Sequence, residues 1–333
     1  MSGRVESRGD QMQVAVLDDY QGVALSMADW SRVEARAEVH VFTDHVFDPR
    51  ALVERLTPYD VVVLMRERTP FPGEVIRGLP SLRLIVTTGP RNASIDVATA
   101  RKQGITVSGT GSLGSAPAEL TWALILGLSR HLVEEVENVR TGGWQTTVGW
   151  DLADRTLGII GLGRIGTQVA AVGRAFGMNV LAWSHNLTPE RAAQVDARAV
   201  PLDELLGSSD VVTVHQVLSD RTKGLIAARE LAQMKRGALL VNTSRAAVLD
   251  TQAVVAALEA GTLGGAALDV FDEEPLPTED PLRTTPGLLL TPHIGYVTEA
   301  VYRRFFGDVV ADIEAFLDGS PINELHAAQH AGR

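Results

Sequence analysis

Short apolar runs rich in β-branched residues recur along the whole chain and alternate with segments of helical periodicity. This alternation predicts parallel sheets flanked by helices, because consecutive parallel strands need a crossover connection. We therefore expect an α/β fold with two Rossmann-like, doubly wound parallel-sheet domains. The first series of expected strands lies near residues 13–17, 39–42, 60–65, 82–87 and 105–107; the second lies near 157–160, 179–183, 211–215, 239–242, 265–269 and 288–290.

Two expected helices organise these strands into domains. A long apolar helix over about residues 116–140 separates the two series, and a last helix over about 298–317 has no strand after it. We expect the last helix to return to the first domain, which makes that domain discontinuous. A length of 333 residues suits two domains, here residues 1–115 plus 299–333 and residues 116–298.

Composition narrows the class of protein. A net charge of −11 and a pI near 5.2 argue against nucleic-acid and anionic-membrane partners. The chain has no cysteine, so disulfides, thiolate metal sites and a catalytic thiol are excluded, and we expect no metal. The longest apolar-rich run, residues 120–128, is too short to span a bilayer, and the polar start lacks the apolar stretch of a secretory signal. We expect a cytoplasmic protein.

A glycine fingerprint, Gly161-Leu-Gly163-Arg-Ile-Gly166, follows the expected strand 157–160. Such a fingerprint alone is weak evidence, but here a buried strand precedes it and a helical pattern follows it. In that context the glycines permit a tight turn, and the helix N-terminus can bind the pyrophosphate of a dinucleotide. The residues at helical spacing after the turn, which we expect to face the core, are Ile165, Val169, Val172 and Phe176.

His293, in the segment TPHIG, comes directly after the expected strand 288–290. The carboxyl ends of parallel strands are where ligands bind, and an imidazole can exchange a proton near neutral pH. Glu274, in LDVFDEEP, is a candidate partner that would fix the imidazole tautomer and favour its charged form. The spacing leaves two alternatives open: a structural histidine, and a glutamate that belongs to an exposed acidic cluster.

Arg245, in VNTSR, lies just beyond the expected strand 239–242. A guanidinium at this edge can bind a substrate carboxylate through two hydrogen bonds and polarise the adjacent carbonyl. Loop capping, or pairing with Asp250, is an equally good interpretation of the residues alone.

Taken together and in this order, GLGRIG, VNTSR, LDVFDEEP and TPHIG make the chain from Gln13 to Pro321 resemble the NAD(P)-dependent D-isomer specific 2-hydroxyacid dehydrogenases. This family includes glyoxylate and hydroxypyruvate reductases and phosphoglycerate dehydrogenases. The resemblance implies hydride transfer between NAD or NADP and a 2-oxo acid or D-2-hydroxy acid, in a cleft between a substrate-binding domain (1–115 plus 299–333) and a dinucleotide-binding domain (116–298). It also implies that Arg245, Glu274 and His293 are catalytic, and that a homodimer forms through the helix beginning near Ala116.

Other functions occur on related scaffolds. One alternative is a formate- or phosphite-type dehydrogenase, and another is a catalytically idle, dinucleotide-sensing protein that resembles a corepressor. Turnover of a 2-oxo acid distinguishes the proposed enzyme from both.

The resemblance also implies a set of cofactor-binding residues. Arg164 and Ile165 would lie at the pyrophosphate, Thr243 beside the cofactor and Asp269 at the nicotinamide carboxamide. Ser184 stands where NAD-specific members carry an acid, so we expect both NAD and NADP to be accepted. The full expected set is Gly161, Gly163, Arg164, Ile165, Gly166, Ser184, His215, Thr243, Asp269 and Gly295.

Substrate binding is expected to involve Arg245 and His293, together with residues of the first domain. Arg66 follows the expected strand 60–65, and Gly89 and Arg91 both follow the expected strand 82–87. The arginines would favour a substrate with a polar or anionic tail; alternatively, each pairs with a nearby acid, Glu67 or Asp96. The family's substrate loop usually presents backbone alone, whereas here Arg91 and Asn92 add polar side chains, and Ala246 replaces the usual glycine after Arg245.

Overall fold

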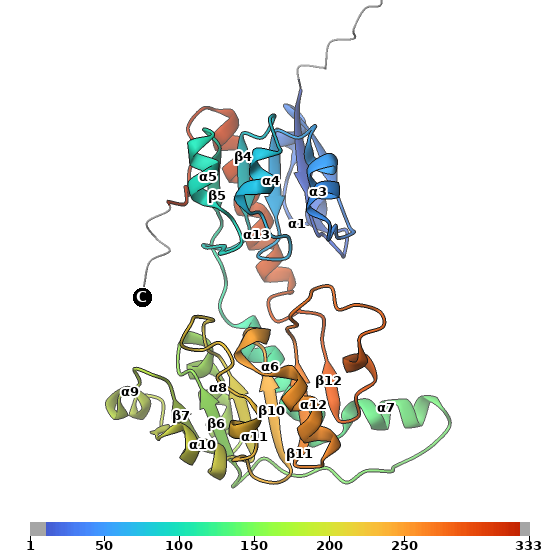
Figure 1. Ribbon diagram of the computed structural model, residues 1–333, viewed down its shortest axis with the longest axis vertical. Helices are drawn as coiled ribbons and strands as arrows, with labels where there is room; N and C mark the ends of the chain where they lie inside the picture. Colours follow the sequence, from blue (N-terminus) through green and yellow to red (C-terminus); the bar gives the residue numbers. More distant parts are fainter. Residues whose placement is uncertain (1–10, 327–333) are drawn as a thin grey trace, which may run out of the picture. The chain divides into compact units, whose positions relative to one another are not determined.

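The computed structural model describes residues 11–326, which form two compact units (Figure 1). The chain passes from the first unit to the second between Leu113 and Gly114, and returns to the first between Val297 and Thr298. Each unit is built on one fully parallel sheet, so the predicted α/β fold with two parallel sheets is confirmed.

The first unit has a five-stranded sheet in the order β2-β1-β3-β4-β5. The strand order reverses between β1 and β3, which is where ligands bind in open α/β sheets. Both central strands β3 and β4 are fully buried, which explains their unbroken apolar sequences. The strands are β1 (Met12–Val16), β2 (Ala37–Val41), β3 (Val61–Leu64), β4 (Leu84–Thr87) and β5 (Thr106–Gly109).

Helices cover both faces of this sheet. One face packs against α3, α4 and α5 through a buried cluster that includes Leu52, Val75 and Val97. The last helix, α13 (Glu299–Leu317), packs against β4 and the two N-terminal helices. The other helices of this unit are α1 (Ala24–Met27), α2 (Ser31–Glu34), α3 (Pro49–Leu56), α4 (Gly73–Arg77) and α5 (Val97–Lys102).

The second unit has a seven-stranded sheet in the order β12-β11-β10-β9-β6-β7-β8. Its order reverses between β6 and β9. Alternate strand residues feed two apolar clusters: Ile159 belongs to the cluster under α6 and α8, and Ile160 to the cluster under α10, α11 and α12. The strands are β6 (Thr156–Ile160), β7 (Asn179–Trp183), β8 (Arg198–Ala199), β9 (Val211–Val214), β10 (Ala238–Asn242), β11 (Leu263–Leu268) and β12 (Leu288–Leu290).

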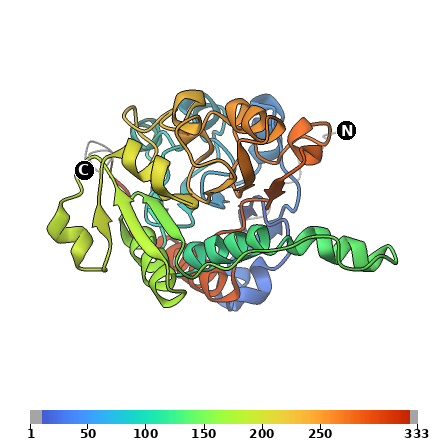
Figure 2. The same ribbon diagram turned by 90° about the horizontal axis from the view of Figure 1, so that it is seen from below.

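The helices of the second unit differ from expectation in one respect. The single helix predicted over residues 116–140 is two helices, α6 (Ala116–Ser129) and α7 (Leu132–Arg140), because the chain breaks at His131, whose φ is 51°. Figures 1 and 2 show α7 extending away from the rest of this unit. The remaining helices are α8 (Arg164–Ala175), α9 (Pro189–Ala193), α10 (Leu202–Ser208), α11 (Ala228–Leu231), α12 (Thr251–Glu259) and two short 3-10 helices, Ala246–Val248 and Pro281–Thr284.

The buried side of α8 also differs from the predicted stripe. Val169 is buried, but Val172 and Phe176 are 39% and 41% exposed. The helix buries Gly166, Val169, Ala170 and Gly173 instead, because the lack of a side chain at Gly173 lets α8 approach Leu157 closely. Small residues therefore replace large apolar ones on the face that contacts the sheet.

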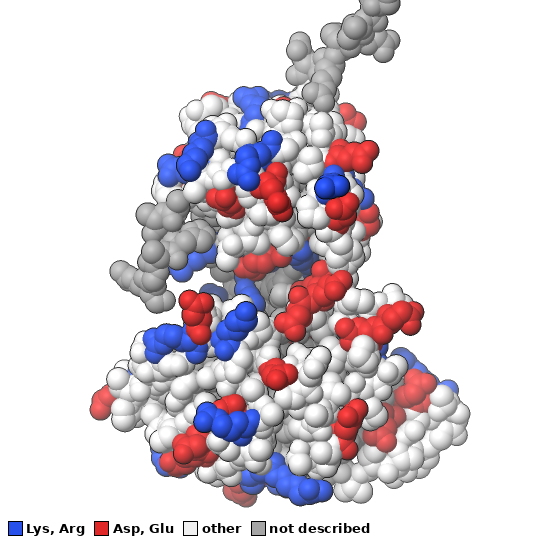
Figure 3. Space-filling model, in the orientation of Figure 1, with Lys and Arg blue, Asp and Glu red and all other residues white. Residues whose placement is uncertain are grey.

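Two observations concern the surface. Among the described residues, no helix combines the length and apolar character needed to cross a membrane. On the face drawn in Figure 3, acidic and basic side chains are interspersed over both units.

Candidate active site

In the glycine turn after β6, the first and last glycines have no room for a side chain, whereas the middle glycine faces open space. A Cβ added at Gly161, whose φ is 104°, would lie 2.7 Å from the carbonyl oxygen of His215, and a Cβ at Gly166 would collide with the carbonyl oxygen of Gly161. A Cβ at Gly163, in contrast, meets no atom within 4 Å. Gly163 is also the N-cap of α8, so the free N–H groups of the helix begin at this open point. The turn therefore suits a phosphate group that approaches the backbone closely.

Ser184 and His215 flank this turn at the position where the strand order reverses. The N–H of Gly161 donates to Trp183, directly before Ser184, over 2.8 Å. The N–H of His215 donates to Ile160 over 2.8 Å. Burial lowers the pKa of His215 to about 4, so this ring is neutral at pH 7, and its Nε2 is buried without a hydrogen-bond partner among the described residues.

Ser184 and the loop that follows it, residues 185–188, contain no acid. The carbonyl of Ser184 accepts from the N–H of Leu187, and the rings of Trp183 and His185 are in tilted contact with centroids 4.8 Å apart. Arg191 is exposed and lies in α9, whose N-cap Thr188 accepts from the Arg191 N–H. Ser184 thus directly follows β7, and the first lysine or arginine after it in the sequence is Arg191, in the first turn of α9.

Other expected cofactor residues also have defined positions. Arg164 is exposed at the start of α8, with its guanidinium beside Gly114, and Ile165 packs on the core under α8. Thr243 follows β10, where its hydroxyl hydrogen-bonds that of Thr121 on α6 over 2.9 Å. This contact fixes the end of β10 against the helix.

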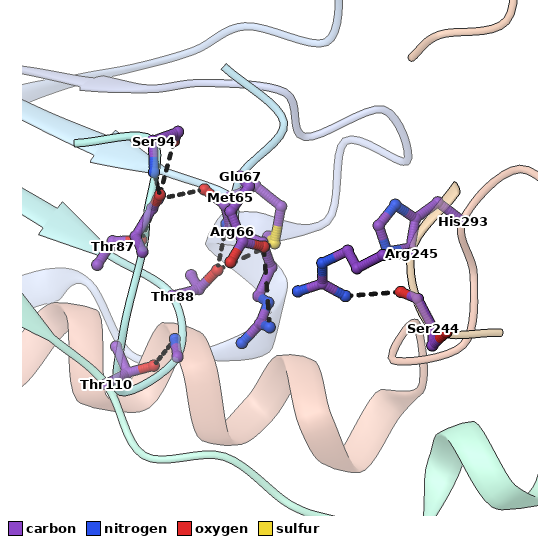
Figure 4. Close-up of polar contacts among 12 residues, drawn as sticks. Met65, Arg66, Glu67, Thr87, Thr88, Ser94, Thr110, Ser244, Arg245 and His293 are labelled. Carbon is purple, nitrogen blue, oxygen red and sulfur yellow. Dashed lines mark hydrogen bonds and ion pairs between the residues drawn. The ribbon is translucent and has the colours of Figure 1, made fainter. Parts of the chain in front are cut away.

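Arg245 lies in a loop that Asn242 holds. The Nδ2 of Asn242 donates to the carbonyl of Arg245 over 2.9 Å, and its Oδ1 accepts from the N–H and hydroxyl of Ser244 over 3.0 and 2.8 Å. Arg245 Nη1 donates to the carbonyl of Ser244 over 2.8 Å (Figure 4). Asp250, the alternative partner considered for Arg245, is the N-cap of α12 and accepts from Ala253. Asn242 was not among the expected site residues, although Asn-x-Ser at the end of a buried strand is a recognisable signal.

His293 and Glu274 form a pair. His293 Nδ1 lies 2.5 Å from Glu274 Oε2, and Glu274 Oε1 accepts from the N–H of Phe271 over 2.9 Å. Burial by itself raises the pKa of the Glu274 carboxyl, but the hydrogen bond and charge of His293, the Phe271 amide and the charge of Arg245 together hold that pKa below its usual value. Glu274 is therefore an ionised, partly buried carboxylate on the imidazole, and not simply one acid of an exposed cluster.

Asp269 holds the segment that carries His293. Its Oδ1 accepts from the Thr291 hydroxyl and the Ile294 N–H over 2.6 and 2.8 Å, and its Oδ2 accepts from the Gly295 N–H over 2.8 Å. Burial raises the pKa of Asp269 despite these donors. His293 has a φ of 52°, so its backbone needs such support. The expected role of Asp269 at the nicotinamide carboxamide stays a prediction.

The first unit contains the other expected substrate residues, Arg66, Gly89 and Arg91. Arg66 follows β3 with a φ of 55° and lies 3.9 Å from the Glu67 carboxylate, so the pairing considered for it does occur, at the outer limit of an ion pair. Arg91 is exposed, and its alternative partner Asp96 caps α5 by accepting from Thr99.

Asn92 does add a polar side chain to this loop, but the side chain is fully buried. Its amide is bonded to the carbonyl of Arg66, to the Thr87 hydroxyl and to the N–H and hydroxyl of Ser94.

Comparisons with known proteins agree with this geometry. The profile of the D-isomer specific 2-hydroxyacid dehydrogenase NAD binding domain matches residues 122–295. The chain is 34% identical to a glyoxylate reductase of Korarchaeum cryptofilum over 297 residues, covering 87% of this chain and 89% of that protein. It is 32% identical to a hydroxypyruvate reductase of Blautia hydrogenotrophica over 325 residues, covering 95% and 100%.

A solved structure extends the similarity to both units. The crystal structure of phosphoglycerate oxidoreductase from Vibrio cholerae o395 matches with a TM-score of 0.88 and 37% identity, covering 93% of this chain and 100% of that one. The family expected from the order of the four motifs is thereby confirmed. This chain belongs to the D-isomer specific 2-hydroxyacid dehydrogenase family.

Proposed function

We propose that this protein is an NAD(P)-dependent reductase of a small 2-oxo acid such as glyoxylate or hydroxypyruvate, which it converts to the corresponding D-2-hydroxy acid. The observation that carries the proposal is the His293–Glu274 pair, whose members follow β12 and β11 in the same unit as the glycine turn. An imidazole supported by a carboxylate is suited to exchange a proton with a carbonyl or hydroxyl oxygen. Relatives named glyoxylate reductase and hydroxypyruvate reductase support the choice of substrate class.

Three side chains would perform the reduction. Arg245 binds the carboxylate of the 2-oxo acid and orients its carbonyl. His293 uses Nδ1 for Glu274, so Nε2 is the ring nitrogen that donates a proton to the carbonyl oxygen. Glu274, whose depressed pKa keeps it ionised, stabilises the imidazolium. Bound NADH or NADPH supplies the hydride to C2, which balances the proton delivered to the oxygen.

The cofactor would bind in the second unit. The open middle of the turn at Gly163 and the first turn of α8 fit the pyrophosphate, and Ser184 would hydrogen-bond the adenosine ribose. Because Ser184 lacks the charge that repels a 2′-phosphate, we propose that both NAD and NADP are used. The other residues assigned to the cofactor are Gly161, Arg164, Ile165, Gly166, His215, Thr243, Asp269 and Gly295.

Each unit would have its own role. We assign substrate recognition to residues 1–115 plus 299–333, where Arg66, Gly89 and Arg91 would read the part of the substrate beyond its 2-oxo acid group. Dinucleotide binding is assigned to residues 116–298, a range that contains the region matched by the family's NAD binding domain.

We also propose a homodimer that forms through α6 and α7. None of the residues of α7 is buried, although several are apolar. Leu132, Val133 and Val139 are 56%, 60% and 57% exposed. Trp144, just beyond this helix, is 72% exposed. Large apolar side chains exposed together on one segment indicate a protein partner, and the family resemblance makes a second copy of this chain the first candidate.

The cytoplasm is the proposed location, with no nucleic-acid or membrane partner. The net charge of −11 opposes binding to polyanions, and acidic groups are interspersed with basic ones on the face drawn in Figure 3. Cell fractionation alongside a cytoplasmic marker tests the location, and recovery with the membrane fraction would contradict it.

Turnover tests the proposed reaction directly. Glyoxylate, hydroxypyruvate, pyruvate and longer 2-oxo acids are each supplied with NADH and NADPH, and nicotinamide absorbance is followed for wild-type protein and His293→Ala. We expect reduction by wild type that is largely lost in the variant. Oxidation of formate or phosphite without reduction of any 2-oxo acid, or NADH binding without any turnover, would reject the proposal.

A further inference from the structure

Two arginines in this chain, one in each unit, are held by the same arrangement of hydrogen bonds. In the second unit, Asn242 takes the N–H and hydroxyl of Ser244 on Oδ1 and gives Nδ2 to the carbonyl of Arg245. The asparagine lies two residues before the serine and three before the arginine. This asparagine clamp therefore fixes the backbone of the arginine to which substrate binding is assigned.

The first unit repeats the clamp around Asn92. Its Oδ1 accepts from the N–H and hydroxyl of Ser94 over 2.9 and 2.6 Å, and its Nδ2 donates to the carbonyl of Arg66 over 2.6 Å. Here the arginine comes 26 residues earlier, at the end of the neighbouring strand β3. The same geometry is thus reached through a different path of the chain, which means that local sequence alone does not produce it.

Asn92 has no hydrogen-bonding capacity left over for a ligand. Its Nδ2 also donates to the Thr87 hydroxyl over 2.9 Å, so two donor hydrogens and two acceptor positions are all used. The side chain is fully buried. Asn92 therefore acts on the reaction only through what it holds.

Asn92 holds the backbone of Arg66, which has an unfavourable conformation. Arg66 has a φ of 55°, a region that non-glycine residues occupy at a cost. Its N–H donates to the Thr88 hydroxyl over 2.9 Å (Figure 4), and its carbonyl accepts from Asn92 over 2.6 Å. Side chains of Thr88 and Asn92, in the loop after β4, thus fix both the N–H and the carbonyl of Arg66.

The guanidinium of Arg66 lies over the backbone of Gly89. A Cβ at Gly89, whose φ is 94°, would collide with Arg66 Nη1, and the Gly89 N–H is itself fixed by the Thr110 hydroxyl over 2.6 Å. The Arg66 side chain remains 24% exposed, and the Glu67 carboxylate is 3.9 Å away. A rigid backbone on one side and partial exposure on the other suit a guanidinium that is held ready for an anion.

We propose that Asn92 is a positioning residue that sets Arg66 to bind an anionic tail of the substrate, beyond its 2-oxo acid group, as Asn242 sets Arg245 to bind the carboxylate. This inference rests on the proposed function for the identity of the ligand, but not for the clamp itself. It assigns to the first unit one anion-binding side chain with a defined orientation, and it explains why this loop carries an asparagine in place of backbone alone.

Kinetics of matched variants test the proposal. Asn92→Asp keeps the size and the acceptor oxygen but removes the donor to Arg66; Arg66→Lys removes the planar guanidinium. For each we expect KM for 2-oxoglutarate, which has a second carboxylate beyond the 2-oxo acid group, to rise about tenfold, as for a lost charge-assisted hydrogen bond. KM for glyoxylate, which has no such group, and KM for NADH should stay unchanged. The double variant should be no worse than the worse single variant, because both changes disable one unit. Additive losses would overturn the proposal.

Asp96→Asn is the control for general damage to this loop. Asp96 caps α5 through the N–H and hydroxyl of Thr99, two helix-side contacts in the same segment that do not involve Arg66. We expect this variant to leave KM for the 2-oxo acids near the wild-type value. A rise equal to that of Asn92→Asp would show that loop stability alone is at work, and would overturn the positioning role.

A second readout does not depend on turnover. Calorimetric titration with glutarate, a non-reacting dicarboxylate with the carbon chain length of 2-oxoglutarate, should show about tenfold weaker binding in Asn92→Asp and Arg66→Lys than in wild type. Hydrogen exchange at the Arg66 and Ser94 amides should be faster in Asn92→Asp. Wild-type protein that binds glutarate but reduces no 2-oxo acid would reject the proposed function alone, whereas glutarate binding unaffected by both variants would reject the positioning role.

Discussion

The contact between His293 and Glu274 links proton transfer to pH. If His293 donates a proton in the reduction, His293→Ala should lose turnover by about 10²–10⁴-fold, the usual contribution of general acid catalysis. The measurement is kcat with NADH and glyoxylate on protein whose unfolding temperature matches wild type. Near-normal turnover in His293→Ala would contradict the assignment.

Glu274→Gln should retain more activity than His293→Ala, with a changed pH dependence. Without the carboxylate the imidazolium loses its stabilising charge, so the alkaline limb of the kcat profile should move to lower pH. Stability should also respond: the folded-state pKa of Glu274 is depressed, so its contribution is present at neutral pH and is lost as pH falls through the acid range. Thermal unfolding of both proteins from pH 7 to pH 3 should show the wild-type advantage shrinking; an advantage that grows in acid would contradict this.

Ser184 is the residue that bears on cofactor preference. Wild-type protein should discriminate between NADH and NADPH by less than tenfold, about 1.4 kcal/mol. Ser184→Asp should weaken use of NADPH selectively, because a carboxylate would repel the 2′-phosphate, and should leave NADH largely unaffected. The ratio of kcat/KM values for the two cofactors is the measurement. Outright rejection of NADPH by wild type would mean that another group excludes the phosphate.

At the scale of elements, the strand–turn–helix of β6 and α8 separates glycines needed for folding from one kept open for a ligand. Gly166→Ala should destabilise the protein by about 1–3 kcal/mol, as overpacking does, because its Cβ would collide with the Gly161 carbonyl. Gly163→Ala should cost about 1 kcal/mol or less, since its Cβ meets open space, yet it should weaken NADH binding.

Thermal unfolding and NADH titration by fluorescence distinguish these two variants. The matched substitution makes each the control for the other. A Gly163→Ala protein that binds NADH like wild type would show that the pyrophosphate does not approach the turn at that point.

Helices and strands could be predicted where burial produces a recognisable pattern of apolar residues in the sequence. The strands β3, β4 and β9 are fully buried, so their unbroken β-branched runs identify them. The break between α6 and α7 escaped prediction because helical periodicity continues across His131, whose left-handed backbone leaves no mark in the pattern. β8 escaped because it has only two residues.

At the scale of the whole molecule, the exposed apolar face of α7 makes oligomeric state the property most open to test. The double variant Val133→Glu/Val139→Glu places two charges on this surface without touching a buried residue of α7. If the homodimer forms through it, light scattering after size-exclusion chromatography should report a dimer for wild type and a monomer for the variant.

Leu25→Glu provides the control, because Leu25 is 44% exposed on α1 of the first unit. This variant should keep the wild-type mass. A monomeric wild type, or a double variant that remains dimeric, would show that α7 is not the interface.

The sequence by itself determined the architecture and the family. Alternating strand and helix patterns specify two parallel sheets, because strands buried on both faces must be apolar throughout and need helical crossovers. The four ordered motifs, which include the glycine turn, identify the dehydrogenase family, because each is a short run of neighbouring residues that can be recognised without knowledge of the fold.

Only the tertiary structure decided which side chains act together. Glu274 and His293 are 19 residues apart, and Asn92 and Arg66 are 26 apart, so spacing alone left the glutamate open as an exposed acid and did not reveal that the asparagine binds the Arg66 backbone. Neighbouring parallel strands end at the same edge of a sheet, and that edge brings distant residues within hydrogen-bond reach. Burial then decides their roles: Asn92 is removed from solvent, and its hydrogen bonds are satisfied by Thr87 and Ser94 nearby and by the backbone of Arg66, which follows the neighbouring strand.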